Sequence, residues 1–176
     1  MAKLWGRVGV NREGREIIPV LRTFGCGVMA ANPDELAISP SDLGVASYVP
    51  LEALFRECDV VIFPESLAKA IHVDEKLLNK DMRARYLLFL SYSLTFDLDL
   101  TRSLIISKHI TSMVIDYLPD VYNVWKDFPY SHYRKIMNFP NVLITPELGF
   151  YTRQSMERNY AQTLHLLQQL DVETFQ

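Results

Sequence analysis

Short apolar runs alternate with helix-like segments along most of this chain. The runs are bounded by polar residues or glycine, a pattern typical of strands that are buried on both faces of a parallel sheet. They lie at Leu4–Val8, Gly27–Ala31, Asp59–Phe63, Tyr86–Leu90, Ser112–Tyr117 and Val142–Thr145. We expect each of these runs to form a strand.

Between the runs, apolar residues recur every three or four positions, which predicts helices over Arg15–Phe24, Pro50–Glu57 and Arg153–Leu170. Asp74 and either Asp97 or Asp99 are expected to cap two more helices. This alternation predicts an α/β fold, a three-layer, doubly wound and mostly parallel sheet of the Rossmann type. Residues 1–176 are expected to form one such domain.

The stretch from Tyr117 to Phe139 interrupts this rhythm. It is rich in aromatic residues, contains prolines and charges, and has no clear period. We interpret it as a long loop whose rings pack on the sheet edge. The alternative is a subunit or partner surface, because aromatic side chains are enriched at interfaces.

Composition and charge exclude several classes of function. The formal charge is −3, and no stretch gathers Lys and Arg into a stripe, which argues against binding to nucleic acid or to a membrane surface. No run approaches the roughly 20 apolar residues of a membrane-spanning helix. Cys26 and Cys58 lie beside apolar runs without the spacing of a metal or redox motif, which favours a reducing, cytoplasmic compartment.

A glycine-bearing segment, Gly9-Val10-Asn11-Arg12-Glu13-Gly14, follows the first predicted strand. In a dinucleotide site the first glycine allows a tight turn, the second lets the backbone approach the pyrophosphate, and the third lets the helix pack on the strand. Gly9 and Gly14 hold the first and third positions, whereas Asn11 holds the second. Asn tolerates left-handed backbone angles, but its side chain occupies space near the pyrophosphate. Arg12 could pair with a phosphate, whereas Glu13 opposes one.

Two further residues bear on this site. Pro19 would cost about 3 kcal/mol inside a helix, which predicts that the helix either kinks there or begins late, near Ile18. A late start would move its positive end away from the phosphates. After the second predicted strand, Asn32 can donate or accept one hydrogen bond with a ribose hydroxyl, but without the charge of a carboxylate.

The order of these segments resembles that of a known family. The glycine motif, the segment Leu51–Val61 and the run Asn141–Gly149, which ends in Thr145-Pro146-Glu147, are similar to the NAD-binding domain of the D-isomer-specific 2-hydroxyacid dehydrogenases. The resemblance implies NAD or NADP as cofactor and association into a dimer. Members of this family also have a substrate-binding domain, for which we find no counterpart in the given sequence.

The resemblance also locates the catalytic positions. A dehydrogenase of this kind uses an arginine to hold the substrate carboxylate and a histidine, poised by a glutamate, to move the proton. These positions fall on Ser93 for the arginine, on Val121 for the glutamate, with Asp120 beside it, and on Glu147 for the histidine. Glu147 is a poor proton donor at neutral pH unless it is buried, so we interpret it as a solvated or structurally paired carboxylate.

The histidines do not restore this chemistry. His72 and His109 are expected near helix ends, His132 in the aromatic stretch and His165 on the last helix. We interpret all of them as structural. Their spacing is not that of a metal site, and no metal is expected.

Three hypotheses follow. The first is a stand-alone module, catalytically inactive, that acts in binding, sensing or assembly with weak or absent affinity for NAD or NADP. The second is half of an active oxidoreductase, which needs a separate substrate-domain partner. The third is a structural domain that self-associates, as a dimer, without a nucleotide. Because sites rather than folds carry function, the changed catalytic positions favour the first.

Overall fold

The computed structural model describes residues 3–9, 12–31, 39–45, 48–64, 71–90, 94–116, 135–145 and 151–174. The chain divides into two compact units, Met1–Pro146 and Glu147–Gln176.

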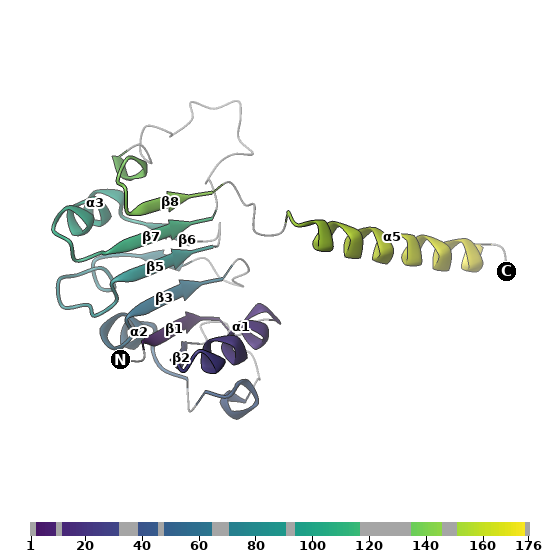
Figure 1. Cartoon of the computed structure of the whole chain (residues 1–176), viewed down its shortest axis with the longest axis horizontal. Helices are drawn as coiled ribbons and strands as arrows, with labels where there is room; N and C mark the ends of the chain where they lie inside the picture. The colour runs from purple at the N-terminus through teal and green to yellow at the C-terminus, as the bar shows by residue number, and fades with distance from the viewer. Residues whose placement is uncertain are drawn as a thin grey trace. The chain divides into compact units, whose positions relative to one another are not determined.

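A parallel sheet forms the centre of the first unit. Among the described residues its strands are β1 (Leu4–Val8), β2 (Gly27–Ala31), β3 (Val60–Phe63), β5 (Tyr86–Phe89), β7 (Ser112–Ile115) and β8 (Val142–Ile144). Their order is β2-β1-β3-β5-β7-β8, and each neighbouring pair is parallel, as the common direction of the arrows in Figure 1 shows. Every predicted strand is therefore confirmed, to within a residue or two at its ends.

A parallel bridge between Ala30 and Tyr48 extends the sheet beyond β2. If this bridge is counted as the third position along the chain, the order across the sheet is 3-2-1-4-5-6-7, and its first six positions have the order of the Rossmann fold. β1 then lies beside the point where the chain crosses from one half of the sheet to the other. In such sheets ligands bind outside the carboxyl ends of the strands at that point.

Helices cover both faces of the sheet. Ala30 packs with Ile18 of α1 (Arg12–Thr23), whereas its neighbour Ala31 belongs to the main core with Leu54 of α2 (Leu51–Glu57). Successive residues of a strand point to opposite faces, so α1 and α2 lie on different sides of the sheet. The buried residues of α3 (Leu98–Ile106) belong to the same core as Leu54, which places α3 on the face that α2 covers. The three predicted layers are confirmed.

The main core is built from alternate strand residues and from these two helices. Rings of Phe63 and Phe89 meet edge to face with their centroids 5.2 Å apart. Gly6 allows α2 to approach β1 closely, because a Cβ atom there would lie 2.9 Å from Sγ of Cys58 and 3.1 Å from Cβ of Leu54.

Some local predictions need correction. Asp74 does not cap a helix: its carboxylate accepts a hydrogen bond from the backbone N–H of Lys76, and residues 75–77 form turns. Asp97 is confirmed as the cap of α3, since it accepts from the N–H of Leu100 at 2.9 Å. Phe24, expected as the last residue of the helix over Arg15–Phe24, follows α1 and is 78% exposed.

Two short strands, β4 (Ile71–Val73) and β6 (Leu94–Phe96), form a separate parallel pair that was not predicted. A 3-10 helix, η1, spans Pro40–Leu43. Within the aromatic stretch, residues 135–137 form a helical turn with Ile136 fully buried. The rest of that stretch up to residue 134 lies outside the described residues.

The second unit contains α5 (Arg153–Thr174), which confirms the predicted helix over Arg153–Leu170. Arg153 and Glu157 form an ion pair at 2.8 Å, one turn apart. In the part of the chain that the structure describes, no helix is both long and apolar enough to cross a membrane.

Candidate dinucleotide-binding site

The carboxyl ends of the strands form a continuous edge. Backbone hydrogen bonds beyond the strand ends join neighbouring strands there: Leu90 donates to Phe63, Asp116 to Phe89, and Thr145 to Ile115. Loops that leave this edge therefore start from fixed positions. This is the edge at which a parallel α/β sheet binds its ligand.

Gly9 makes the turn that leaves β1. Its φ of 73° lies in the left-handed region, which favours glycine, and its N–H donates to the carbonyl of Ala31 at 2.8 Å. The turn is thus held against the end of β2. Gly9 is buried, as expected of a backbone that a ligand or a helix approaches closely.

The helix after this turn begins at Arg12 and runs through Pro19 to Thr23. The predicted late start near Ile18 is wrong. Gly14 lies in the first turn of α1, as the glycine spacing requires. Backbone N–H groups in the first turn of a helix have no partner within that helix, so α1 offers donors and the positive end of its dipole close to the end of β1.

Arg7 is a functional candidate that the sequence analysis missed. It lies on β1 with 1% of its surface exposed, and its Nε donates to the carbonyl oxygen of Gly9 at 3.1 Å. The sequence offered one signal for this residue, which is that a cationic side chain interrupts the apolar run Leu4–Val8. Burial of an arginine is costly without compensating hydrogen bonds, so its bond to Gly9 ties the side chain to the geometry of the turn.

A second pair that was missed joins the ends of β7 and β8. The hydroxyl of Thr145 donates a hydrogen bond to Oδ1 of Asp116, although the residues are 29 positions apart. Thr145 begins the segment Thr145-Pro146-Glu147 that the sequence analysis singled out. The pair fixes Thr145 at the carboxyl edge.

The remaining predicted positions are only partly visible. Asn11, Asn32, Ser93, Asp120, Val121 and Glu147 lie outside the described residues, and of Arg12 only the backbone is described. The structure therefore brings together Gly9 and the helix that carries Gly14, with Arg7 in addition.

Histidines within the described residues make local contacts. His72 lies on β4 rather than at a helix end, and its Nδ1 is 2.9 Å from Oγ1 of Thr95. His109 follows α3 and lies 3.0 Å from Oγ of Ser107. Nε2 of His165 is 3.2 Å from the side-chain nitrogen of Gln169. The described residues contain no group of three or more His, Cys, Asp or Glu side chains placed to hold a metal ion.

The opposite, amino edge of the sheet is held by Asp59. Its Oδ2 accepts from the N–H of Leu4 at 2.8 Å, its Oδ1 accepts from Nε of Arg83 at 3.0 Å, and its backbone carbonyl accepts from Arg85 at 2.9 Å. The hydrogen bond from Leu4, followed by that from Arg83, holds the pKa of this carboxyl below its ordinary value of 3.8.

Cys58 lies beside Asp59 and is fully buried. Burial, followed by the negative charges of Glu57 and Asp59, raises the pKa of the Cys58 thiol to about 12. Both of these shifts lie at the amino edge, away from the Gly9 turn.

The strand order, the glycine turn and the helix that starts directly after it define a Rossmann-type domain of the dinucleotide-binding kind. The profile of the D-isomer specific 2-hydroxyacid dehydrogenase NAD binding domain matches residues 1–149, and the chain belongs to this family.

Known relatives agree with this assignment. The chain is 25% identical over 168 residues to a D-specific alpha-keto acid dehydrogenase of Enterococcus faecium. The matched region covers 90% of this chain and 50% of the relative. The NAD-complexed D-isomer specific 2-hydroxyacid dehydrogenase of Lactobacillus delbrueckii ssp. bulgaricus has a TM-score of 0.72 at 23% identity over 98% of this chain and 53% of the other. Salmonella D-lactate dehydrogenase has a TM-score of 0.75 at 23% identity, over 97% and 54%. This chain therefore spans about half the length of the proteins it matches.

Proposed function

We propose that this chain is a dinucleotide-binding module, for NAD or NADP, that does not catalyse the dehydrogenase reaction of its relatives. The observation that carries the proposal is the Gly9 turn, with its φ of 73° and its hydrogen bond to Ala31, followed at once by the start of α1 at Arg12. This geometry suits a pyrophosphate, which helix N-termini after glycine turns bind through backbone N–H groups.

The residues of the site fit such a cofactor in part. Gly9 and the first turn of α1, with Gly14, would hold the pyrophosphate, and Arg7 would hold the turn. Asn11 puts a side chain where a second glycine would leave space, which weakens binding. A bound nicotinamide would supply a hydride donor or acceptor.

Loss of catalysis is supported by the residues at the family positions. By resemblance of the surrounding sequence, Ser93, Val121 and Glu147 stand where the family has arginine, glutamate and histidine. Serine cannot hold a carboxylate by a bidentate ion pair, and valine cannot poise a base. We infer a role in binding, sensing or assembly, with a dimer as the expected oligomer.

Titration with NADH, followed by nicotinamide fluorescence, tests the proposal. We expect weak binding, with a dissociation constant above about 100 μM, corresponding to about −5 kcal/mol. Asn11→Gly should tighten it by about tenfold, because the backbone can then approach the pyrophosphate. If neither the wild-type protein nor Asn11→Gly binds NADH, the proposed dinucleotide function is overturned, and the self-associating structural domain is favoured.

A matched pair of glycine variants makes this test specific. Gly9 and Gly25 have φ angles of 73° and 74°, and they lie before and after α1. The backbone strain that Ala meets from φ is therefore similar at both positions. We expect Gly9→Ala to abolish NADH binding and Gly25→Ala to leave it intact; equal loss in both would show that the effect comes from general destabilisation.

Oxidation of NADH with a 2-oxo acid as substrate tests the absence of catalysis. We expect no turnover by this chain alone. Turnover by the chain alone would contradict the proposal. Turnover only after addition of a separate substrate-domain protein would support the alternative, that of an oxidoreductase half.

A further inference from the structure

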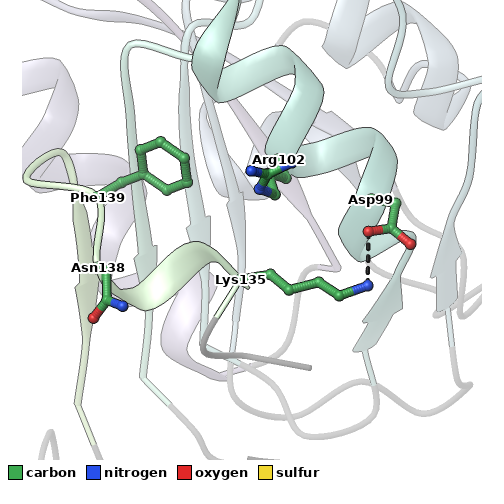
Figure 2. Close-up of a pocket in the computed structure, with 5 residues that line it drawn as sticks. All are labelled: Asp99, Arg102, Lys135, Asn138 and Phe139. Carbon is green, nitrogen blue, oxygen red and sulfur yellow. Dashed lines mark hydrogen bonds and ion pairs between the residues drawn. The ribbon is translucent and has the colours of Figure 1, made fainter. Parts of the chain in front are cut away.

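A groove runs along α3, and none of its lining residues belongs to the Gly9 turn. At one end is a polar hollow of about 400 Å³ lined by Asp99, Arg102, Lys135, Asn138 and Phe139, which Figure 2 shows. At the other end is a hollow of about 550 Å³ with a mostly apolar lining that includes Ile105, Ile106, Ile110, Phe139 and Pro140. Because Phe139 lines both hollows and α3 contributes to both, we call them together the α3 groove.

Buried residues fix both walls of the α3 groove. On the α3 side, Thr101 is fully buried, and Leu104 and Ile105 are almost so. On the other side, Ile136 is fully buried and its carbonyl accepts from the N–H of Phe139 at 3.1 Å. The side chain of Asn141 donates to the carbonyl of Thr111 at 3.0 Å. The groove is therefore preformed, which reduces the entropy cost of binding.

The residues that line the groove carry more positive than negative charge. Nζ of Lys135 pairs with Oδ1 of Asp99 at 2.8 Å and links the two walls, as the dashed line in Figure 2 shows. Arg102 is exposed, and within the described ranges no side chain or backbone group pairs with its guanidinium. Lys108 adds a cation at the apolar end. The groove is thus locally positive on a chain with a net charge of −3, and its chemistry favours a carboxylate at Arg102.

The depth of the groove indicates what kind of molecule it fits. Arg102, Pro140 and Ile106, which is 54% exposed, remain open to solvent. Pockets for small molecules bury most of the ligand surface, whereas a shallow groove with an apolar end suits the side chains of another polypeptide.

We propose that the α3 groove binds a partner polypeptide segment in which an acidic side chain lies next to apolar ones. The carboxylate pairs with Arg102, and the apolar side chains lie on Phe139, Ile106 and Pro140. Local charge complementarity selects the acidic segment although the chain as a whole is acidic.

Fluorescence anisotropy with short fluorescein-labelled peptides tests this proposal without any nucleotide. We expect a peptide of alternating Glu and Leu to bind, and a Lys–Leu peptide and a Glu–Ser peptide to bind more weakly by about tenfold or more. Arg102→Glu should reverse the preference between the Glu–Leu and Lys–Leu peptides. Ile106→Asp should weaken binding of the Glu–Leu peptide. Failure of the wild-type protein to bind the Glu–Leu peptide would overturn the proposal.

Arg56→Glu on α2 is the matched control, because it makes the same change in net charge at an exposed site that lines neither hollow. It should leave peptide binding unchanged, and an effect equal to that of Arg102→Glu would overturn the site assignment. Sedimentation velocity completes the test. If the wild-type chain is a dimer and Arg102→Glu dissociates it, the proposed partner is overturned. The groove is then assigned to a second copy of this chain.

Discussion

Asp59 accepts hydrogen bonds from the backbone N–H of Leu4 and from Nε of Arg83, and it stabilises the fold more strongly while its carboxyl is charged. Its side chain is 26% exposed, so solvent screens part of the interaction with Arg83. The hydrogen bond from the backbone N–H of Leu4 stabilises the fold more than the one from Arg83, because that N–H is held in place at the start of β1.

We predict that Asp59→Asn lowers the free energy of unfolding at neutral pH by about 1–2 kcal/mol. The folded pKa of Asp59 lies below its ordinary value of 3.8. Its contribution is therefore complete above that value and is lost as the pH falls through the folded pKa. Urea unfolding at several pH values should show the wild-type and Asp59→Asn stabilities converging in acid.

Asp81→Asn is the control for this experiment. Asp81 is exposed, and its carboxylate accepts no hydrogen bond from another described residue. Its replacement should change stability little at any pH. A difference between wild type and Asp59→Asn that stays constant down to strong acid would contradict the assigned role of the charge.

The two thiols should differ in reactivity. Cys26 is partly exposed, whereas Cys58 is buried with a pKa raised to about 12. Because the thiolate is the reactive form, we predict that a disulfide reagent such as DTNB modifies Cys26 in the folded protein and Cys58 only after unfolding. A Cys26→Ser variant should then show no rapid reaction; a rapid one would mean that Cys58 is accessible.

At the scale of the elements, the end of α3 carries local strain. Lys108 has a φ of 59°, and N–H groups of His109 and Ile110 donate back to the carbonyl of Leu104. This left-handed position after a helix usually holds glycine. We predict that Lys108→Gly raises the free energy of unfolding by up to about 1 kcal/mol.

Thermal or urea unfolding of Lys108→Ala provides the comparison. Alanine removes the same charge but keeps the Cβ atom that causes the strain, so it should not stabilise the protein. If both variants were equally stabilised, the lysine charge rather than the backbone angle would be the cause.

α1 shows how packing can outweigh a local preference. Proline costs about 3 kcal/mol inside a helix, which led to the prediction of either a kink or a late start. Ile18 is fully buried and Ile17 and Leu21 are partly buried. Burial of one such side chain contributes about 1.5–3 kcal/mol, so together they offset the proline. The hydroxyl of Thr23 also donates to the carbonyl of Pro19 at 3.0 Å.

The short strands β4 and β6 could not be predicted from the sequence for a different reason. β4 and β6 have three residues each with a polar residue in the middle, so neither is a continuous apolar run, unlike the equally short β8. Asp74 illustrates a related ambiguity, since the same carboxylate contact caps helices and closes isolated turns. The strands of the six-stranded sheet could be predicted because most of their residues are apolar.

For the whole molecule, the layered fold and the family could be predicted from the sequence, because both depend on patterns local to each segment. Within the candidate site, spacing identified Gly9 and Gly14. It missed Arg7 and the pair of Asp116 and Thr145. Their significance depends on burial in the sheet and on contact between distant strands, and the sequence specifies these only through the finished fold.

The hydrogen bonds of Asp59 and the proposed nucleotide site lie at opposite edges of the sheet. Asp59 joins the amino ends of β1, β3 and β5, whereas the Gly9 turn and the start of α1 lie at the carboxyl edge. Substitutions at the amino edge should therefore alter the unfolding free energy with little change in nucleotide affinity.

A practical route to immobilising this protein follows from the common direction of its strands. Lys3 lies at the amino edge, directly before β1, with its ammonium 4.1 Å from the centre of the Tyr86 ring. A tether attached there would anchor the molecule by the end remote from the Gly9 turn. A sensor surface coated in this way would present the turn to the flowing solution, so that analytes reach it without obstruction from the support.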